Sequence, residues 1–227
     1  MKPKIRVIIP AFNEQNAVGN VIREIPRDLV EEIIVVNNAS TDDTERVALK
    51  ENATVLHEPV KGYGNACLKG ISYIQNKPTD IVVFLDADYS DYPEEMRQLV
   101  KPIMLNEADM VIGSRALGNR ERGAMMPQQI FGNWLATSLI RLIYKMRFTD
   151  LGPFRAISYD KLQALGMQDR DYGWTVEMQL KAAKARMRCI EVPVTYRKRI
   201  GFSKVSGTVK GTVMAGYKII WTIFKYI

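Results

Sequence analysis

Short apolar runs alternate with helical patterns along the first half of the chain. Residues 5–9, 33–36, 54–57, 81–85 and 110–112 are rich in β-branched or aliphatic side chains, which are typical of buried strands. Between these runs, apolar residues recur at the spacing of an amphipathic helix. This alternation predicts an α/β fold with a Rossmann-like, doubly wound and mostly parallel sheet that is covered on both faces.

The second half of the chain is less regular. Apolar side chains in residues 130–148 fall on one helical face, and a short strand is expected in residues 152–158. A helix at 172–184, a last strand at 188–194 and a C-terminal amphipathic helix at 206–227 complete the expected elements. No repeat, linker or low-complexity segment interrupts the sequence, so we expect a single domain over the whole chain.

Polar residues directly follow four of the expected strands. They are "AFNE" after the first strand, "NNASTDD" after the second, "DADYSD" after the fourth and "GSR" after the fifth. In open α/β sheets, ligands bind outside the carboxyl ends of the strands, near a topological switch point. The pattern therefore predicts a ligand site at this edge of the sheet.

Two carboxylates end the fourth strand, at Asp86 and Asp88. Just past a strand end the backbone turns, so two such side chains can converge on one cation. Mg²⁺ and Mn²⁺ prefer oxygen ligands, and proteins commonly hold Mg²⁺ by one or two carboxylates together with substrate phosphates. We therefore expect Asp86 and Asp88 to bind a divalent cation. Asp91 precedes a proline at the expected start of a helix, and we interpret it as a helix cap.

Amide side chains lie at the ends of the first two strands. Asn13 and Glu14 can hydrogen-bond a ligand there, although Glu14 is equally suited to cap the helix that follows. Asn37 and Asn38 lie where a nucleoside commonly binds in doubly wound folds. The stretch "KGYGNA" has two glycines before a helix, which permits close approach of the backbone to a ligand.

The formal net charge of +7 suggests an anionic partner. Nucleic acid is not favoured, because the basic residues are not interleaved with aromatic residues in a recognisable module. A phosphorylated molecule or a membrane surface fits better, since arginine pairs well with phosphate oxygens. The phosphate contacts are expected from the second half of the chain, at Arg115, Arg155, Arg197, Arg199, Ser203 and Lys204.

The motifs together resemble those of a known family. They occur in the order "VIIPAFNE", "VVNNASTDDT", "KGYGNA", "FLDAD", "VIGSR", "YGWTVEM" and "VPVTYRKRIGFSK". This series, over residues 5–210, is similar to that of family 2 glycosyltransferases with the GT-A fold. Within that family it is nearest to the polyprenyl- or dolichyl-phosphate mannose and glucose synthases.

The resemblance implies an inverting, metal-dependent transfer of a hexose from UDP-hexose or GDP-hexose. Residues 1–115 would then bind the nucleotide sugar and residues 116–205 the acceptor, with Mg²⁺ or Mn²⁺ between the donor diphosphate and the carboxylates. Asn37 stands where relatives usually have Asp, which leaves the nucleotide open. The expected donor site comprises Pro10, Ala11, Asn13, Glu14, Asn37, Asn38, Lys61, Gly62, Asp86, Ala87 and Asp88.

The expected acceptor is a polyprenyl phosphate of the dolichyl or undecaprenyl type. A phosphate is already anionic near neutral pH, so it needs cation contacts more than a general base. The candidates for catalysis are Asp88, Arg115 and Glu177. If the acceptor is instead a hydroxyl of a glycan or a soluble molecule, Glu177 is the residue expected to act as the base. A sugar-phosphate nucleotidyltransferase is a second alternative, but it would need a Gly-rich, Arg-containing loop directly after the first strand, where this chain has "PAFNE". A nucleotide-sugar binding module without catalytic activity is a third.

The C-terminal stretch "GYKIIWTIFKYI" combines a narrow polar stripe with aromatic and aliphatic residues. A membrane interface, the protein core and a second subunit of a homodimer are all suitable partners for such a helix. No uncharged apolar run approaches the ~18 residues of a transmembrane helix. The N-terminal apolar run is too short for a signal peptide. We therefore expect a cytoplasmic protein, at most peripheral to the cytoplasmic face of a membrane.

Overall fold

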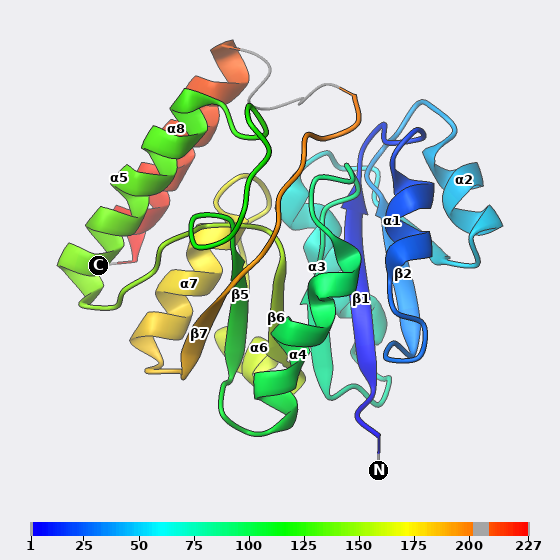
Figure 1. Cartoon of the computed structure of the whole chain (residues 1–227), viewed down its shortest axis with the longest axis horizontal. Coiled ribbons are helices and arrows are strands. Elements are labelled where there is room, and N and C mark those ends of the chain that lie inside the picture. Colours follow the sequence, from blue (N-terminus) through cyan, green and yellow to red (C-terminus); the bar gives the residue numbers. More distant parts are fainter. Residues whose placement is uncertain (1, 202–208, 227) are drawn as a thin grey trace.

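The computed structural model describes residues 2–201 and 209–226. Across these residues the chain forms one seven-stranded sheet with helices on both faces (Figure 1). The strands are β1 (Ile5–Ala11), β2 (Glu32–Asn37), β3 (Thr54–His57), β4 (Ile81–Phe84), β5 (Met110–Ser114), β6 (Arg155–Ser158) and β7 (Cys189–Pro193). Their order in the sheet is β3-β2-β1-β4-β6-β5-β7. The predicted α/β fold with a mostly parallel sheet is therefore confirmed.

One strand departs from the parallel arrangement. β6 runs antiparallel between β4 and β5, with Ala156 opposite Val83 on one side and Val111 on the other. The neighbouring pairs β1-β2, β1-β4, β2-β3 and β5-β7 are parallel. The carboxyl ends of β1, β2, β4 and β5 consequently lie at the same edge of the sheet.

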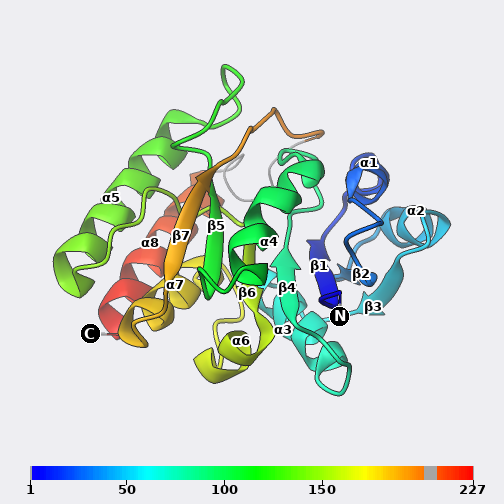
Figure 2. The ribbon, with the colours of Figure 1, turned by 60° about the horizontal axis from the view of Figure 1, so that its bottom comes forward.

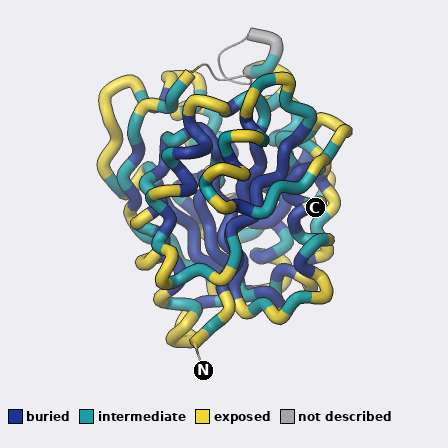
Figure 3. Tube along the Cα trace, turned by 90° about the vertical axis from the view of Figure 1, so that its right-hand side faces the viewer, coloured by how far each residue is buried: buried dark blue, intermediate teal, exposed yellow. Residues whose placement is uncertain are grey.

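Helices cover the sheet in two layers. They are α1 (Val18–Glu24), α2 (Thr44–Lys50), α3 (Tyr63–Ile74), the 3₁₀ helix η1 (Pro93–Glu95), α4 (Met96–Met104), α5 (Pro127–Tyr144), α6 (Tyr159–Leu165), α7 (Trp174–Lys184) and α8 (Val209–Lys225). Because successive strand residues point to opposite faces, Val7 and Ile9 pack with α1, α2 and α4, whereas Ile8 packs with α3 and α6–α8. Figure 3 shows these buried strands enclosed by more exposed segments.

The C-terminal helix α8 packs against α5 and α7. Figures 1 and 2 both show α5 and α8 side by side at one end of the molecule, beyond β7. Among the described residues, no helix is both long and apolar enough to cross a membrane. The expected helix at the C-terminus is therefore present, and its inner side contacts the core.

Candidate active site

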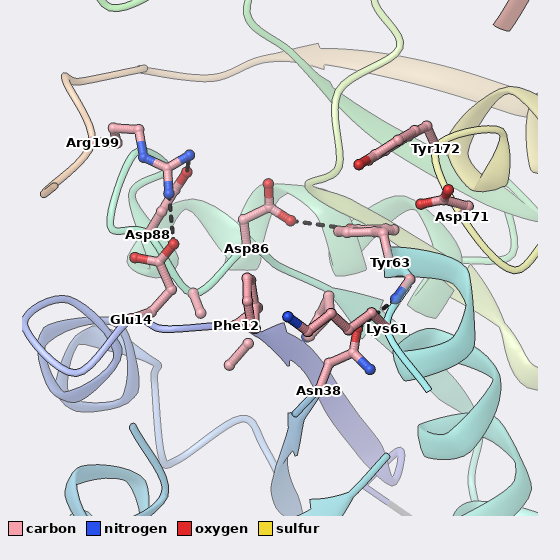
Figure 4. A pocket seen from close by; sticks show the side chains of 14 residues that line it. Phe12, Glu14, Asn38, Lys61, Tyr63, Asp86, Asp88, Asp171, Tyr172 and Arg199 are labelled. Atoms are coloured by element: carbon pink, nitrogen blue, oxygen red, sulfur yellow. Dashed lines mark hydrogen bonds and ion pairs between the residues drawn. The ribbon is translucent and has the colours of Figure 1, made fainter. Parts of the chain in front are cut away.

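A pocket of about 400 Å³ opens at the carboxyl ends of β1, β2 and β4 (Figure 4). Segments that are distant in the sequence meet there, as the polar residues after the strands predict. The residues that were expected in a donor site and that line this pocket are Pro10, Ala11, Glu14, Asn38, Lys61, Gly62, Asp86, Ala87 and Asp88. Whether they bind a donor stays a prediction, but the fold brings them together.

Asp86 lines this pocket, two residues after the end of β4. Its Oδ1 accepts a hydrogen bond from the hydroxyl of Tyr63 at 3.0 Å. Burial, and next the charge of Asp88, raise the pKa of the Asp86 carboxyl to about 7. A carboxylate whose pKa is raised in this way at the wall of a pocket is a strong candidate for binding a cation.

Asp88 is held from two sides. Its Oδ1 accepts hydrogen bonds from the backbone N–H of Ser90 at 2.9 Å and from the Ser90 hydroxyl at 2.5 Å. Its Oδ2 lies 3.0 Å from Nη1 of Arg199, whose Nη2 lies 2.6 Å from Glu14. The N–H of Ile200 also donates to the Asp88 carbonyl at 3.0 Å. Arg199 therefore bridges the end of β1 and the end of β4.

The donor set at this position suits a hard divalent cation. Asp86 and Asp88 supply carboxylate oxygens at the pocket wall. Within the two described ranges, no group of three or more His, Cys, Asp or Glu side chains is placed to hold a metal ion. A cation here would therefore take its remaining ligands from water or substrate oxygens, as Mg²⁺ commonly does.

The asparagines after β1 and β2 organise loops. Asn38 donates to the carbonyls of Glu58 at 3.0 Å and Val60 at 2.7 Å, and its Oδ1 accepts the N–H of Gly62 at 2.8 Å. It thereby shapes the loop that presents Lys61 to the pocket. The ammonium of Lys61 lies 4.6 Å from the centre of the Phe12 ring.

Two expected donor residues are not among the residues that line the first pocket. The side-chain oxygen of Asn13 accepts the N–H of Thr41 at 2.8 Å, and that of Asn37 accepts the N–H of Ser40 at 3.0 Å. Neither side chain is part of the described pocket lining. Their side-chain oxygens join the two loops beyond β1 and β2, and a direct contact of either residue with a ligand stays a prediction.

A second pocket of about 360 Å³ adjoins the first. The two share Tyr63, Asp86, Asp88, Tyr172 and Arg199. From these shared residues the second pocket reaches the space between two helices, where it is lined by Gly132 and Asn133 of α5 and by Ala215, Gly216 and Ile219 of α8. The pocket thus joins charged residues to a part lined by small, apolar and amide side chains, among them Gln128 and Gln129.

Arg115 lines the second pocket, as expected for a phosphate contact. Asp150 holds its guanidinium in a fork, with Nε to Oδ2 at 2.8 Å and Nη2 to Oδ1 at 2.6 Å. Burial opposes the charge on Asp150, but Arg115 outweighs it and lowers the pKa of this carboxyl. The fork fixes the orientation of Arg115 at the pocket wall.

The structure places two other expected phosphate ligands elsewhere. Arg155 is fully buried and donates to the carbonyls of Gly152 and Thr175, at 3.2 and 3.0 Å, so it joins two chain segments. Arg197 pairs with Glu24 at 2.7 Å and lies over the ring of Tyr89. Neither cation lines the two pockets, and protein groups already surround both, so a phosphate contact by them stays a prediction that these contacts do not support. Ser203 and Lys204 lie outside the described residues.

Glu177, expected as a general base for a hydroxyl acceptor, also lies outside both described pockets. It is on α7 with an exposure of 0%. Its carboxylate accepts hydrogen bonds from the backbone N–H of Asp169 at 2.6 Å and from the hydroxyl of Tyr226 at 2.6 Å, and Lys181 lies 2.8 Å away. Since these donors occupy both of its oxygens, the structure does not support Glu177 as a base.

Asp91 is not a helix cap. The helix start that follows it has no side-chain cap hydrogen bond. The Asp91 carboxylate is buried, and neither oxygen has a hydrogen-bond partner among the described residues. Burial, and next the charge of Asp86, raise the pKa of Asp91 well above its ordinary value. The acidic stretch after β4 is therefore one cluster in which Asp88 and Asp91 are buried, and the capping role expected for Asp91 is corrected.

Four further residues complete the first pocket, namely Phe12, Tyr63, Asp171 and Tyr172. Phe12 lies in "AFNE" and Tyr63 in "KGYGNA", but nothing in these motifs indicates that the aromatic side chains line a pocket. Asp171 and Tyr172 come from the loop between α6 and α7, about one hundred residues later in the chain. Tyr172 begins the motif "YGWTVEM", and Asp171 directly precedes it, but neither residue was expected in the site.

Comparison with known proteins gives consistent matches. Residues 6–166 match the family model described as Glycosyl transferase family 2. An uncharacterised glycosyltransferase of Mycobacterium tuberculosis is 33% identical over 213 residues, which cover 93% of this chain and 94% of that protein. The undecaprenyl-phosphate mannosyltransferase of Micrococcus luteus is 30% identical over 221 residues, covering 92% of this chain and 90% of that protein.

A solved structure shows the same fold. The crystal structure of glucosyl-3-phosphoglycerate synthase from Mycobacterium tuberculosis, in complex with phosphoglyceric acid, matches with a TM-score of 0.79. The match covers 99% of this chain and 80% of that chain, at 24% identity. At this identity the similarity concerns the arrangement of the strands and helices.

Proposed function

Because the chain belongs to glycosyl transferase family 2, we propose that it transfers a hexose from a nucleoside-diphosphate sugar to a polyprenyl phosphate, with inversion at the anomeric carbon. One observation carries the choice of acceptor. The lining of the second pocket combines the cations Arg115 and Arg199 with small and apolar residues that include Gly132 of α5 and Ala215, Gly216 and Ile219 of α8, beside the carboxylates Asp86 and Asp88 and three amide side chains of α5. This arrangement is complementary to a molecule with an anionic head group and an apolar chain.

The relatives support this acceptor class. The similar protein of Micrococcus luteus is an undecaprenyl-phosphate mannosyltransferase, and it matches over nearly its whole length. A UDP-N-acetylglucosamine–dolichyl-phosphate N-acetylglucosaminyltransferase of Methanococcus voltae is 28% identical over 96% of this chain. The solved neighbour, by contrast, binds the soluble phosphoglyceric acid. An anionic head group is common to both kinds of acceptor.

In the proposed reaction, the protein acts mainly by positioning the acceptor phosphate beside the donor sugar. An oxygen of the acceptor phosphate attacks the anomeric carbon, and the nucleoside diphosphate leaves. Arg115 and Arg199 orient the phosphate beside the donor pocket, and no proton has to be removed from it near neutral pH. Tyr63 holds Asp86 by its hydrogen bond, and Ser90 holds Asp88. A divalent cation bound at these carboxylates would supply Lewis-acid stabilisation of the charge on the leaving diphosphate.

The function is tested with a panel of donors and acceptors. UDP- and GDP-hexoses are incubated with Mg²⁺ or Mn²⁺ and with undecaprenyl phosphate, phosphoglyceric acid, a neutral glycan or no acceptor. We expect one donor to be consumed with formation of a glycosylated lipid phosphate, and no lipid product in the presence of a chelator. Product only with phosphoglyceric acid or the glycan would refute the lipid acceptor, and no transfer with any combination would refute the proposed reaction.

The outer face of α5 and α8 supports a lipid acceptor. Large apolar side chains that are mostly exposed gather on the outer face of these two adjacent helices, at Phe131, Trp134, Leu142, Tyr217, Trp221 and Phe224. Neither helix contains an acidic residue, whereas Arg141, Lys145 and Lys225 lie near or on them with exposed side chains. Aromatic residues combined with cations are typical of surfaces that lie in an anionic membrane interface. We therefore assign this face to the membrane surface that would contain the lipid acceptor.

Phe131→Ser is expected to weaken binding to vesicles that contain anionic lipid by about tenfold, because it removes one large apolar contact. Co-sedimentation with phosphatidylglycerol-containing vesicles measures this. Leu49→Ser, on α2 at the other end of the sheet, is the matched control, since the two side chains are 60% and 53% exposed. If Phe131→Ser instead converts a dimer into a monomer with unchanged vesicle binding, this face is a subunit contact.

A further inference from the structure

The inner side of α8 carries polar residues that reach two buried acids. The hydroxyl of Tyr226, directly after α8, donates to Glu177 at 2.6 Å. The ammonium of Lys218 lies 3.1 Å from Oδ2 of Asp169. Asp169 and Glu177 are 8% and 0% exposed, so both contacts are inside the protein. The C-terminal helix is therefore joined to the core by charge-assisted hydrogen bonds as well as by apolar packing.

The same two acids hold the loop between α6 and α7. Glu177 accepts the backbone N–H of Gln168 at 3.0 Å and that of Asp169 at 2.6 Å. Asp169 in turn accepts the N–H of Asp171 at 2.8 Å and that of Gly173 at 3.2 Å. The conformation of residues 168–173 thus depends on acids whose other partners are on α7 and α8.

This loop forms part of the first pocket. Asp171 and Tyr172 line it directly. The carbonyl of Arg170 accepts the N–H of Asn65 at 3.0 Å. A Cβ added at Gly64 would lie 2.0 Å from the carbonyl oxygen of Asp169, so the loop rests on the backbone of the segment that presents Lys61. A shift of residues 168–173 would therefore alter two sides of the pocket.

We propose that Tyr226 and Lys218 are positioning residues that set the donor pocket through Glu177, Asp169 and the loop of residues 168–173. The identity of the ligand as a nucleotide sugar rests on the proposed function. Because α8 also lines the second pocket through Ala215, Gly216 and Ile219, binding there and binding in the donor pocket are coupled. Such coupling is reciprocal, so each ligand changes the affinity for the other by the same factor.

The proposal is tested with Tyr226→Phe and Lys218→Met in the full chain. Each variant removes the contact to one acid, and Tyr226→Phe keeps the aromatic ring. Calorimetric titration with UDP and with GDP measures nucleotide affinity. Steady-state kinetics give the KM for the donor and kcat. The rate of amide hydrogen exchange in residues 168–173 reports how firmly the loop is held. We expect roughly five- to tenfold weaker nucleotide binding and a similar rise in donor KM, with kcat changed less than twofold, and faster exchange of the loop.

Two controls separate positioning from general stability. Tyr73→Phe, on α3, also removes a hydroxyl that donates to an acid, here Glu32 at the amino end of β2 at 2.8 Å, and should change none of these quantities. Lys218→Arg keeps the cation opposite Asp169 and should restore most of the nucleotide affinity. Lower melting temperatures in Tyr226→Phe and Lys218→Met, with unchanged nucleotide affinity and loop exchange, would overturn the proposal.

The failure of the proposed function would look different. If the wild-type chain binds neither UDP nor GDP, the nucleotide assignment is wrong. The exchange of residues 168–173 is measured without any nucleotide, so it still decides whether α8 controls the loop. Unchanged exchange in both variants would then refute the link between α8 and the loop.

Discussion

Asp88→Asn is expected to lower the rate of hexose transfer by about 10³-fold or more, while the protein stays folded. The substitution removes one of the two carboxylates after β4 that line the pocket, and a cation bound there would lose a charged ligand. Lewis-acid stabilisation of a leaving diphosphate contributes several kcal/mol, and each 1.36 kcal/mol corresponds to about tenfold in rate. The measurements are the initial rate with the preferred donor and the affinity for Mn²⁺ by calorimetry.

The fold should survive this change for a structural reason. The Oδ1 of an asparagine at position 88 can still accept the hydrogen bonds that Ser90 donates to Asp88, and Arg199 keeps its partner Glu14. We therefore expect the free energy of unfolding to change by no more than about 1 kcal/mol. Asp160→Asn, an exposed acid on α6, is the control and should leave rate and metal affinity unchanged. An Asp88→Asn protein with wild-type activity would refute the metal assignment.

The sequence predicts well which residues lie at the carboxyl ends of the strands, because short local patterns of apolar and polar residues determine where each strand ends. A buried apolar strand that ends in polar residues specifies where those residues emerge. Parallel strands bring such ends together whatever the loops do. For that reason Asp86, Asp88, Glu14 and Asn38 meet in one pocket, as the strand ends indicate. The antiparallel insertion of β6 does not disturb this edge, because it leaves β4 and β5 parallel to each other.

The second half of the site could not be predicted in the same way. A charged residue in a motif gives the same sequence signal whether it faces a ligand or a protein carbonyl. Arg155 and Arg197 were expected at a phosphate, yet Arg155 joins backbone carbonyls and Arg197 pairs with Glu24, which is 173 positions away. Partners so distant in the chain are set by tertiary packing, which hydrophobic periodicity does not encode.

Asp91 shows a related limit. An acid before a proline at a helix start has an ordinary local explanation, and this explanation is sufficient for most such residues. The structure instead buries the carboxylate without a hydrogen-bond partner among the described residues. Asp91 belongs to the acidic cluster because the fold places it near Asp86, Asp88 and Arg115, and its pKa shift reflects this position. The sequence around Asp91 does not indicate this.

Glu177→Gln should lower the free energy of unfolding by about 3 kcal/mol. This is the lower end of the loss that is typical when one partner of a buried ion pair is removed. Two backbone N–H groups, the Tyr226 hydroxyl and the Lys181 ammonium all donate to this carboxylate. A glutamine has one acceptor oxygen and an amide that itself donates, so its amide would face another donor. Urea denaturation near neutral pH measures the loss, and the exposed Glu107→Gln is the control.

The pH dependence and the kinetics of Glu177→Gln separate a positioning residue from a general base. Burial alone would raise the pKa of Glu177, but the hydrogen bonds from Lys181, Tyr226 and the backbone outweigh it and lower the pKa below 4.5. The stability that the carboxylate adds is therefore present above pH 4.5, and it shrinks as the pH falls below that value. For the folded variant we expect a raised donor KM with a nearly unchanged kcat. A drop in turnover by roughly two orders of magnitude or more with donor affinity intact, as expected for a missing general base, would restore the hydroxyl-acceptor alternative.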